Sequence, residues 1–141
     1  MVTWLILGIA VHFVAVFLPA AFLVPRMGYG AYLGSRDGEP EATGPYGRAR
    51  RILRNSNESI AAFVGLAVAA IALDAAAGDA VVLPVGSAGD VNMELATLGA
   101  MIFVIARLAF IPLYLFGVPL IRSAVWTAGL GGLVLMAFAL I

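Results

Sequence analysis

Four apolar runs, each long enough to cross a lipid bilayer, occupy most of this 141-residue chain. They cover approximately residues 3–25, 52–73, 94–116 and 119–141. A bilayer interior offers no water to backbone N–H and C=O groups, so spans of this length fold as helices. The sequence therefore predicts an all-α integral membrane protein, a left-handed up-down bundle of four transmembrane helices. We expect one domain over residues 1–141, with helices at about 3–25, 48–75, 94–116 and 119–141.

The composition supports a chain that faces lipid. Hydrophobic residues make up 63% of it and charged residues 11%, with a mean hydropathy of +1.06. A soluble domain of this length could not bury so much apolar surface. The segment Met1–Thr3 lacks the basic residues that begin a signal peptide, so we expect the first helix to be retained.

The chain contains no cysteine, which excludes disulfides, a thiolate nucleophile and cysteine-ligated metals. Its single histidine, His12, makes a poor metal site, and we expect no bound metal. The glycine-rich first connection, about 26–47, holds no phosphate-binding motif of the P-loop or Rossmann type. We also expect no nucleic-acid partner. Any thiol chemistry must therefore come from a bound ligand.

Arginines concentrate on one side of the predicted bundle. Six of the eight arginines lie between the first two apolar runs or at the start of the second, from Arg26 to Arg54, whereas the second connection, about 78–92, is acidic. By the positive-inside rule, the first connection and the third, beside Arg122, face the cytoplasm. Both termini then face the opposite side, and we expect a multi-pass protein of the inner (cell) membrane.

A polar stripe opens the second predicted helix. Four side chains fall within roughly 80° of one another at about 100° per helical residue: Arg48, Arg51, Asn55 and Glu58. Small residues continue this face inward, where a neighbouring helix could approach closely: Ala62, Gly65, Ala69 and Ala72. Charge is expensive at membrane depth, so the stripe predicts a functional site. The alternative is a positive-inside anchor with two polar bystanders, although Glu58 adds nothing to such an anchor.

The third helix supplies Arg107, Phe110 and Tyr114, which share one face at positions i, i+3 and i+7. Arg107 lies too deep to reach the membrane surface easily, and an unpaired arginine there costs about 2.5–3.5 kcal/mol. We therefore expect Arg107 to pair with Glu58, whether that pair is structural or functional. The fourth helix opens with Arg122, either another cytoplasmic anchor or a cation beside the polar stripe.

Several arginines, a glutamate, an asparagine and a tyrosine thus converge at the cytoplasmic ends of the last three helices. Guanidinium groups bind carboxylates in bidentate geometry, and a lone carboxylate suits an ammonium group. A small zwitterionic ligand of net negative charge fits this set. An amphipathic anionic lipid fits nearly as well.

Two stretches of the chain resemble a known family. They are R-A-R-R-I-L-R-N-S-N-E, from Arg48 to Glu58, and A-R-L-A-F-I-P-L-Y-L-F-G-V-P-L-I-R, from Ala106 to Arg122. Both are similar to the membrane-associated proteins in eicosanoid and glutathione metabolism (MAPEG), which include microsomal glutathione transferases and the lipoxygenase-activating protein. The chain looks most like the small bacterial members of this family.

The resemblance implies a homotrimer that binds glutathione as co-substrate between subunits, together with membrane lipid and a lipophilic small-molecule substrate. It implies glutathione contacts at matching positions: Arg51, Asn55, Glu58, Arg107 and Tyr114. It also implies that Arg122 acts in catalysis by stabilising the glutathione thiolate, which would attack a lipophilic electrophile or reduce a lipid hydroperoxide. Ser59 and Phe110 stand where relatives often have tyrosine, and each lost hydroxyl removes about 1 kcal/mol of binding.

Two other functions fit a chain of this kind. One is a non-catalytic lipid-binding scaffold of the same fold, which would not bind glutathione. The other is a small multidrug exporter, which typically carries a carboxylate in its first helix; the run Thr3–Val24 has none. Fold alone does not decide, because function depends on the site.

Overall fold

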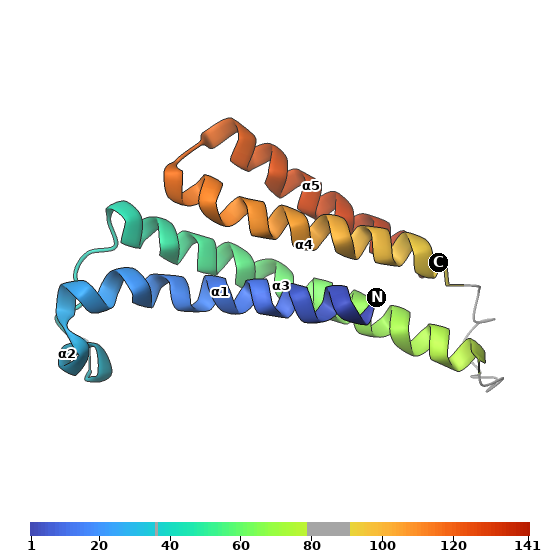
Figure 1. The fold of residues 1–141 in the computed structure, drawn as a ribbon, viewed down its shortest axis with the longest axis horizontal. Coiled ribbons are helices and arrows are strands. Elements are labelled where there is room, and N and C mark those ends of the chain that lie inside the picture. Colours follow the sequence, from blue (N-terminus) through green and yellow to red (C-terminus); the bar gives the residue numbers. More distant parts are fainter. Residues whose placement is uncertain (36, 79–90) are drawn as a thin grey trace.

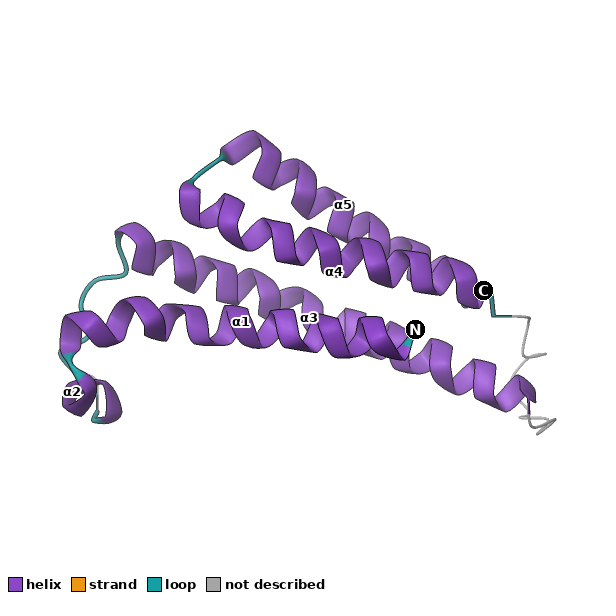
Figure 2. Ribbon diagram, viewed as in Figure 1, coloured by secondary structure: helices purple, strands orange, loops and turns teal. Residues whose placement is uncertain are grey.

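The computed structural model describes residues 1–35, 37–78 and 91–141, and this part of the chain is helical with no strand. The helices are α1 (Val2–Met27), α2 (Tyr29–Leu33), α3 (Gly44–Gly78), α4 (Met93–Phe116) and α5 (Pro119–Phe138), as Figures 1 and 2 show. Four of them, all but α2, are long and apolar enough to cross a membrane. The protein is therefore a multi-pass integral membrane protein with four spanning helices, as predicted.

The helices run up and down as two antiparallel pairs. α1 packs along α3, α4 packs most extensively against α5, and α4 joins the pairs by contacts with both α1 and α3 (Figure 1). Both chain termini lie at one end of the bundle, while α2 and the α4–α5 turn lie at the other. Most of the predicted acidic second connection, residues 79–90, lies outside the described residues, as does Arg36.

The turn between α4 and α5 depends on a glycine and a proline. Gly117 ends α4 in the left-handed region, with φ 75° and ψ 36°, where a side chain would be strained. Val118 then donates its N–H to the carbonyl of Leu113 at 3.0 Å, and Pro119 begins α5 where no N–H partner is needed. This confirms the tight third connection that the sequence predicts.

The core is built from stacked rings and from glycines at a helix crossing. Phe63 of α3 stacks on Phe103 of α4, with ring centroids 4.5 Å apart. At the α4–α5 crossing, a methyl group on Gly132 would lie 2.6 Å from the carbonyl oxygen of Gly99, so the two backbones are in direct contact. Small residues allow this close approach within a membrane.

The predicted small-residue face of α3 does not take part in this helix crossing. Ala62, Gly65 and Ala72 are exposed, Ala69 is half-buried, and nothing lies within 4 Å of the position that a methyl group on Gly65 would take. No helix within the described part of this chain covers that face. The close packing occurs at α4 and α5 instead.

Candidate functional site

Arg107 is the buried polar centre of the bundle. Its side chain is 9% exposed, and its Nη1 donates a hydrogen bond to the Oδ1 of Asn55 on α3 at 2.6 Å. The guanidinium lies near two aromatic rings of its own helix, 5.1 Å from the centroid of Phe103 and 5.9 Å from that of Phe110. Such an arrangement stabilises a desolvated cation through a charge-assisted hydrogen bond and the faces of aromatic rings.

The predicted pair between Glu58 and Arg107 is not formed. Within the described residues, the ion pair present joins Arg50 to Glu39. Glu58 is exposed on α3, whereas Asn55 is half-buried and its side chain reaches Arg107 of α4. Asn55 therefore takes the place that the sequence assigns to Glu58. The residues of the predicted stripe do lie on one helix, but Asn55 turns toward α4 and Glu58 remains exposed.

Arg51, Tyr114 and Arg122 form a contact chain across three helices. The Nε of Arg51 on α3 donates to the hydroxyl of Tyr114 on α4 at 3.2 Å. On α5, the guanidinium carbon of Arg122 lies 4.4 Å from the centroid of the Tyr114 ring. Two cations thus flank one phenol, and Tyr114 fixes both of them. The structure brings together these three residues as the sequence predicts.

Arg48, the first residue of the polar stripe, reaches the α4–α5 turn. Its Nη1 lies 3.6 Å from the position that a methyl group on Gly117 would take. Its Nε is buried without a hydrogen-bond partner among the described residues, as is the Nε of Arg107. Arg48 therefore brings the start of α3 against the end of α4.

A cavity of about 430 Å³ opens beside this contact chain, within the size range of small-molecule sites. Its lining comes from α3, α4 and α5: Asn55, Phe110, Tyr114, Arg122, Ser123, Trp126 and Thr127. Three of the predicted site residues, Asn55, Tyr114 and Arg122, line it directly. Arg51 does not line it but donates a hydrogen bond to Tyr114, which does. Arg107 lies behind it, bonded to Asn55, and Glu58 does not line it.

The cavity is completed by Ser123, Trp126 and Thr127, which are not among the site residues predicted from the sequence. The hydroxyls of Ser123 and Thr127 each donate to a backbone carbonyl one turn back, at 3.0 Å, so their oxygens remain acceptors. Their spacing could have identified them as site residues, because Ser123, Trp126 and Thr127 share a helix face next to Arg122.

The charge of the cavity is positive. Arg122 lines it, Arg51 lies behind Tyr114, and none of its lining residues is acidic. Within the described part of the chain, no three His, Cys, Asp or Glu side chains come together as metal ligands would. The arrangement can bind an anion, lower the pKa of an acidic group on a ligand, and place an apolar group against Phe110 and Trp126.

Comparison with known proteins gives one match. The sequence model of the MAPEG family matches residues 1–141, the whole chain. The comparison with curated proteins and the comparison with solved structures find no match.

Proposed function

The chain belongs to the MAPEG family, and from this premise we propose that it is a membrane-bound glutathione-dependent transferase or peroxidase. The observation that carries the proposal is the cationic cavity in which Arg122, Tyr114 and Asn55 meet. Glutathione brings the thiol that this cysteine-free chain lacks. In the proposed complex, Arg51 binds a glutathione carboxylate and the cavity receives the thiol.

Asn55 and Arg107 act as a unit in this proposal. The amide of Asn55 accepts a hydrogen bond from buried Arg107 at 2.6 Å through its oxygen, which leaves its NH₂ group to donate to a ligand carboxylate. Arg107 therefore contributes to glutathione binding by orienting Asn55, and its positive charge lies behind the anionic ligand. Glu58, exposed on α3, is proposed to bind the glutathione ammonium from outside the cavity.

Arg122 is proposed to stabilise the thiolate. Lowering a thiol pKa from about 8.5 toward 6.5 requires roughly 2.7 kcal/mol, within reach of nearby cations in a partly desolvated site. In transfer, the thiolate sulfur forms a bond to an electrophilic carbon, and the carbon's leaving group takes the electron pair. In peroxide reduction, the sulfur attacks the terminal oxygen and the O–O bond breaks with its electron pair on the leaving alkoxide. The alkoxide takes up the proton that was released when the thiol ionised, so an alcohol and a glutathione sulfenic acid form. A second glutathione then gives the disulfide and water.

A homotrimer in the inner membrane completes the proposal, with the first and third connections cytoplasmic and both termini outside. Glu58 and the small residues Ala62 and Gly65 are exposed in the single chain. An uncovered carboxylate in a spanning helix is costly, so a neighbouring copy would cover this face of α3.

A non-catalytic lipid-binding scaffold is the second candidate, and Phe110 favours it. This residue places a phenyl ring without a hydroxyl in the cavity. Trp126 adds a further apolar face. A cationic cavity with two such walls also suits an amphipathic acid.

Calorimetric titration of glutathione into the purified protein tests the proposal, with Arg51→Ala and Arg54→Ala as a matched pair. Both arginines are exposed on α3, and only Arg51 contacts Tyr114 among the described residues. We expect Arg51→Ala to weaken binding about tenfold or more, because a hydrogen bond to a charged group contributes about 1.5–3 kcal/mol. We expect Arg54→Ala to bind as the wild type does. Absence of binding at millimolar glutathione would contradict the proposal and leave the scaffold.

A further inference from the structure

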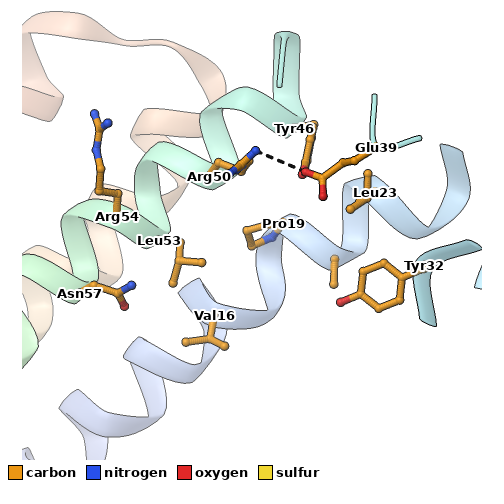
Figure 3. Close-up of a pocket in the computed structure, with 11 residues that line it drawn as sticks. Val16, Pro19, Leu23, Tyr32, Glu39, Tyr46, Arg50, Leu53, Arg54 and Asn57 are labelled. Atoms are coloured by element: carbon orange, nitrogen blue, oxygen red, sulfur yellow. Dashed lines mark hydrogen bonds and ion pairs between the residues drawn. The ribbon is translucent and has the colours of Figure 1, made fainter. Parts of the chain in front are cut away.

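The chain's single histidine contacts α3 within the bundle, at a place that the proposed function does not use. The Nδ1 of His12 on α1 lies 2.9 Å from the Oγ of Ser56 on α3, and both residues are half-buried. The pocket that Figure 3 shows lies between the same two helices but nearer to the first connection, and on α1 its lining begins at Val16, one turn after His12. The contact between His12 and Ser56 is therefore a separate feature of the bundle.

Two small cavities adjoin this contact, each with a volume of about 10 Å³, which is enough for one water molecule. Val11, Ser56 and Arg107 line both of them, so both lie among α1, α3 and α4. One of the two is also lined by His12 and Ser59. A buried water molecule is stable where two to four polar groups surround it, and the polar side chains of these cavities meet that condition.

Arg107 needs a further hydrogen-bond acceptor. Its side chain is 9% exposed, and one of its five N–H groups donates to Asn55. Its Nε is buried without a hydrogen-bond partner, and no carboxylate pairs with it, among the described residues. A buried charged donor that lacks an acceptor is costly, so a water molecule that accepts from this guanidinium stabilises the bundle.

The two serines provide the acceptors that such a water molecule needs. The hydroxyl of Ser59 donates to the backbone carbonyls of Asn55 and Ser56, at 3.3 and 3.2 Å, so its oxygen can still accept. When the Nδ1 of neutral His12 carries no hydrogen, it accepts the hydroxyl hydrogen of Ser56 and fixes its direction. The oxygen of Ser56 is then also free to accept. A water molecule can thus accept from Arg107 and donate to the serine oxygens.

We propose that water molecules occupy these two cavities and join the His12–Ser56 contact to Arg107. His12 is thereby a positioning residue for the cationic cavity, because Arg107 holds the amide oxygen of Asn55 at 2.6 Å and Asn55 lines that cavity. The contacts continue from α1 through α3 and α4 to the cavity wall. The water contact forms without any ligand, whereas its effect on glutathione rests on the proposed function.

NMR spectroscopy of the protein with ¹⁵N-labelled arginine, in detergent micelles and without glutathione, tests the water contact. Each of the eight arginines gives one Nε–H signal, and Arg107→Lys identifies the signal of Arg107. Two quantities are measured for this N–H group: the transfer of magnetisation from water, and the rate of hydrogen exchange with solvent. Circular dichroism checks that each variant folds.

Four variants separate the contact from simple packing. His12→Leu removes the ring nitrogen, and His12→Asn restores an acceptor, since its Oδ1 is as many bonds from the backbone as Nδ1. Ser56→Val replaces the hydroxyl and fills the space beside it with methyl groups. Val14→Leu is the control, because Val14 is exposed on α1 and lines neither cavity.

We expect transfer from water to the Arg107 N–H in the wild type, in His12→Asn and in Val14→Leu, and its loss in Ser56→Val. Hydrogen exchange should be about fivefold faster in His12→Leu, as for the loss of one hydrogen bond of ordinary strength, and His12→Asn should restore the slow rate. Absence of transfer in the wild type, or its persistence in Ser56→Val, would overturn the proposal. Equal exchange rates in His12→Leu and His12→Asn would also overturn it, because His12 would then contribute packing alone.

Calorimetry measures the effect of His12 on the cationic cavity. The affinity for glutathione should fall up to about fivefold in His12→Leu and return in His12→Asn, with Val14→Leu equal to the wild type. Equal affinities of His12→Leu and the wild type would refute the positioning role. A wild type that does not bind glutathione would contradict the proposed function, and the NMR measurements would still decide the water contact.

Discussion

The glycine crossing of α4 and α5 gives a sharp test of the packing. We predict that Gly132→Ala destabilises the protein although alanine is the better helix former. A methyl group at this position would lie 2.6 Å from the carbonyl oxygen of Gly99 and 2.9 Å from the backbone nitrogen of Phe103. Ordinary van der Waals contact begins at 3.4 Å, and both neighbours are backbone atoms that no rotamer change can move.

The adjacent glycine provides the control. Gly131 is exposed and has nothing within 4 Å of the corresponding methyl position. Gly131→Ala should therefore leave stability unchanged or raise it by up to about 1 kcal/mol, the usual gain of alanine over glycine in a helix. Both variants share that gain, so the difference between them isolates the overpacking, which typically costs about 1–3 kcal/mol.

The assay is unfolding in mixed micelles by increasing SDS, followed by the fluorescence of Trp126 and Trp4. We expect the free energy of unfolding to be lower for Gly132→Ala than for Gly131→Ala by about 1–3 kcal/mol. Equal unfolding curves for the two variants would refute the direct backbone contact between α4 and α5.

Two further predictions concern the site and the first connection. Tyr114→Phe removes the hydroxyl that accepts a hydrogen bond from Arg51 at 3.2 Å. Calorimetry should show the affinity for glutathione lowered about fivefold, as expected for the loss of a hydrogen bond of about 1 kcal/mol. An unchanged affinity would show that Tyr114 is not part of the site. Gly47→Ala forces the connection away from Ala42, so proteolysis within residues 34–43 should become faster, whereas wild-type protection would show that the connection is not held there.

The sequence is sufficient to predict the helices, because length and hydropathy decide membrane spans. The predicted third helix, about 94–116, differs from α4 by one residue, and the Gly117–Pro119 turn lies where predicted. The fourth, predicted to residue 141, ends at Phe138. The second begins at Gly44, four residues before the predicted start. The short helix α2 (Tyr29–Leu33) lies in the glycine-rich first connection, where the sequence predicts no helix.

The partners of individual polar groups were harder to predict. Helical periodicity places Asn55 and Glu58 on one broad face, but it does not say which of them turns toward α4. The outcome depends on the angle at which α3 crosses α4, and in the structure Arg107 donates its hydrogen bond to Asn55. The contact of Glu39 with Arg50 and Tyr46 joins a loop to a helix and has no periodic signal in the sequence.

The stabilisation of a glutathione thiolate by Arg122 is the central claim of the proposed function. Ultraviolet difference absorption measures the thiolate directly as glutathione is added to the wild type and to Arg122→Ala, with Arg54→Ala as control. At neutral pH we predict a thiolate band in the wild type and in the control, and its loss in Arg122→Ala at saturating glutathione. Glutathione that binds to the wild type without forming a thiolate, or a band that persists in Arg122→Ala, would contradict the claim.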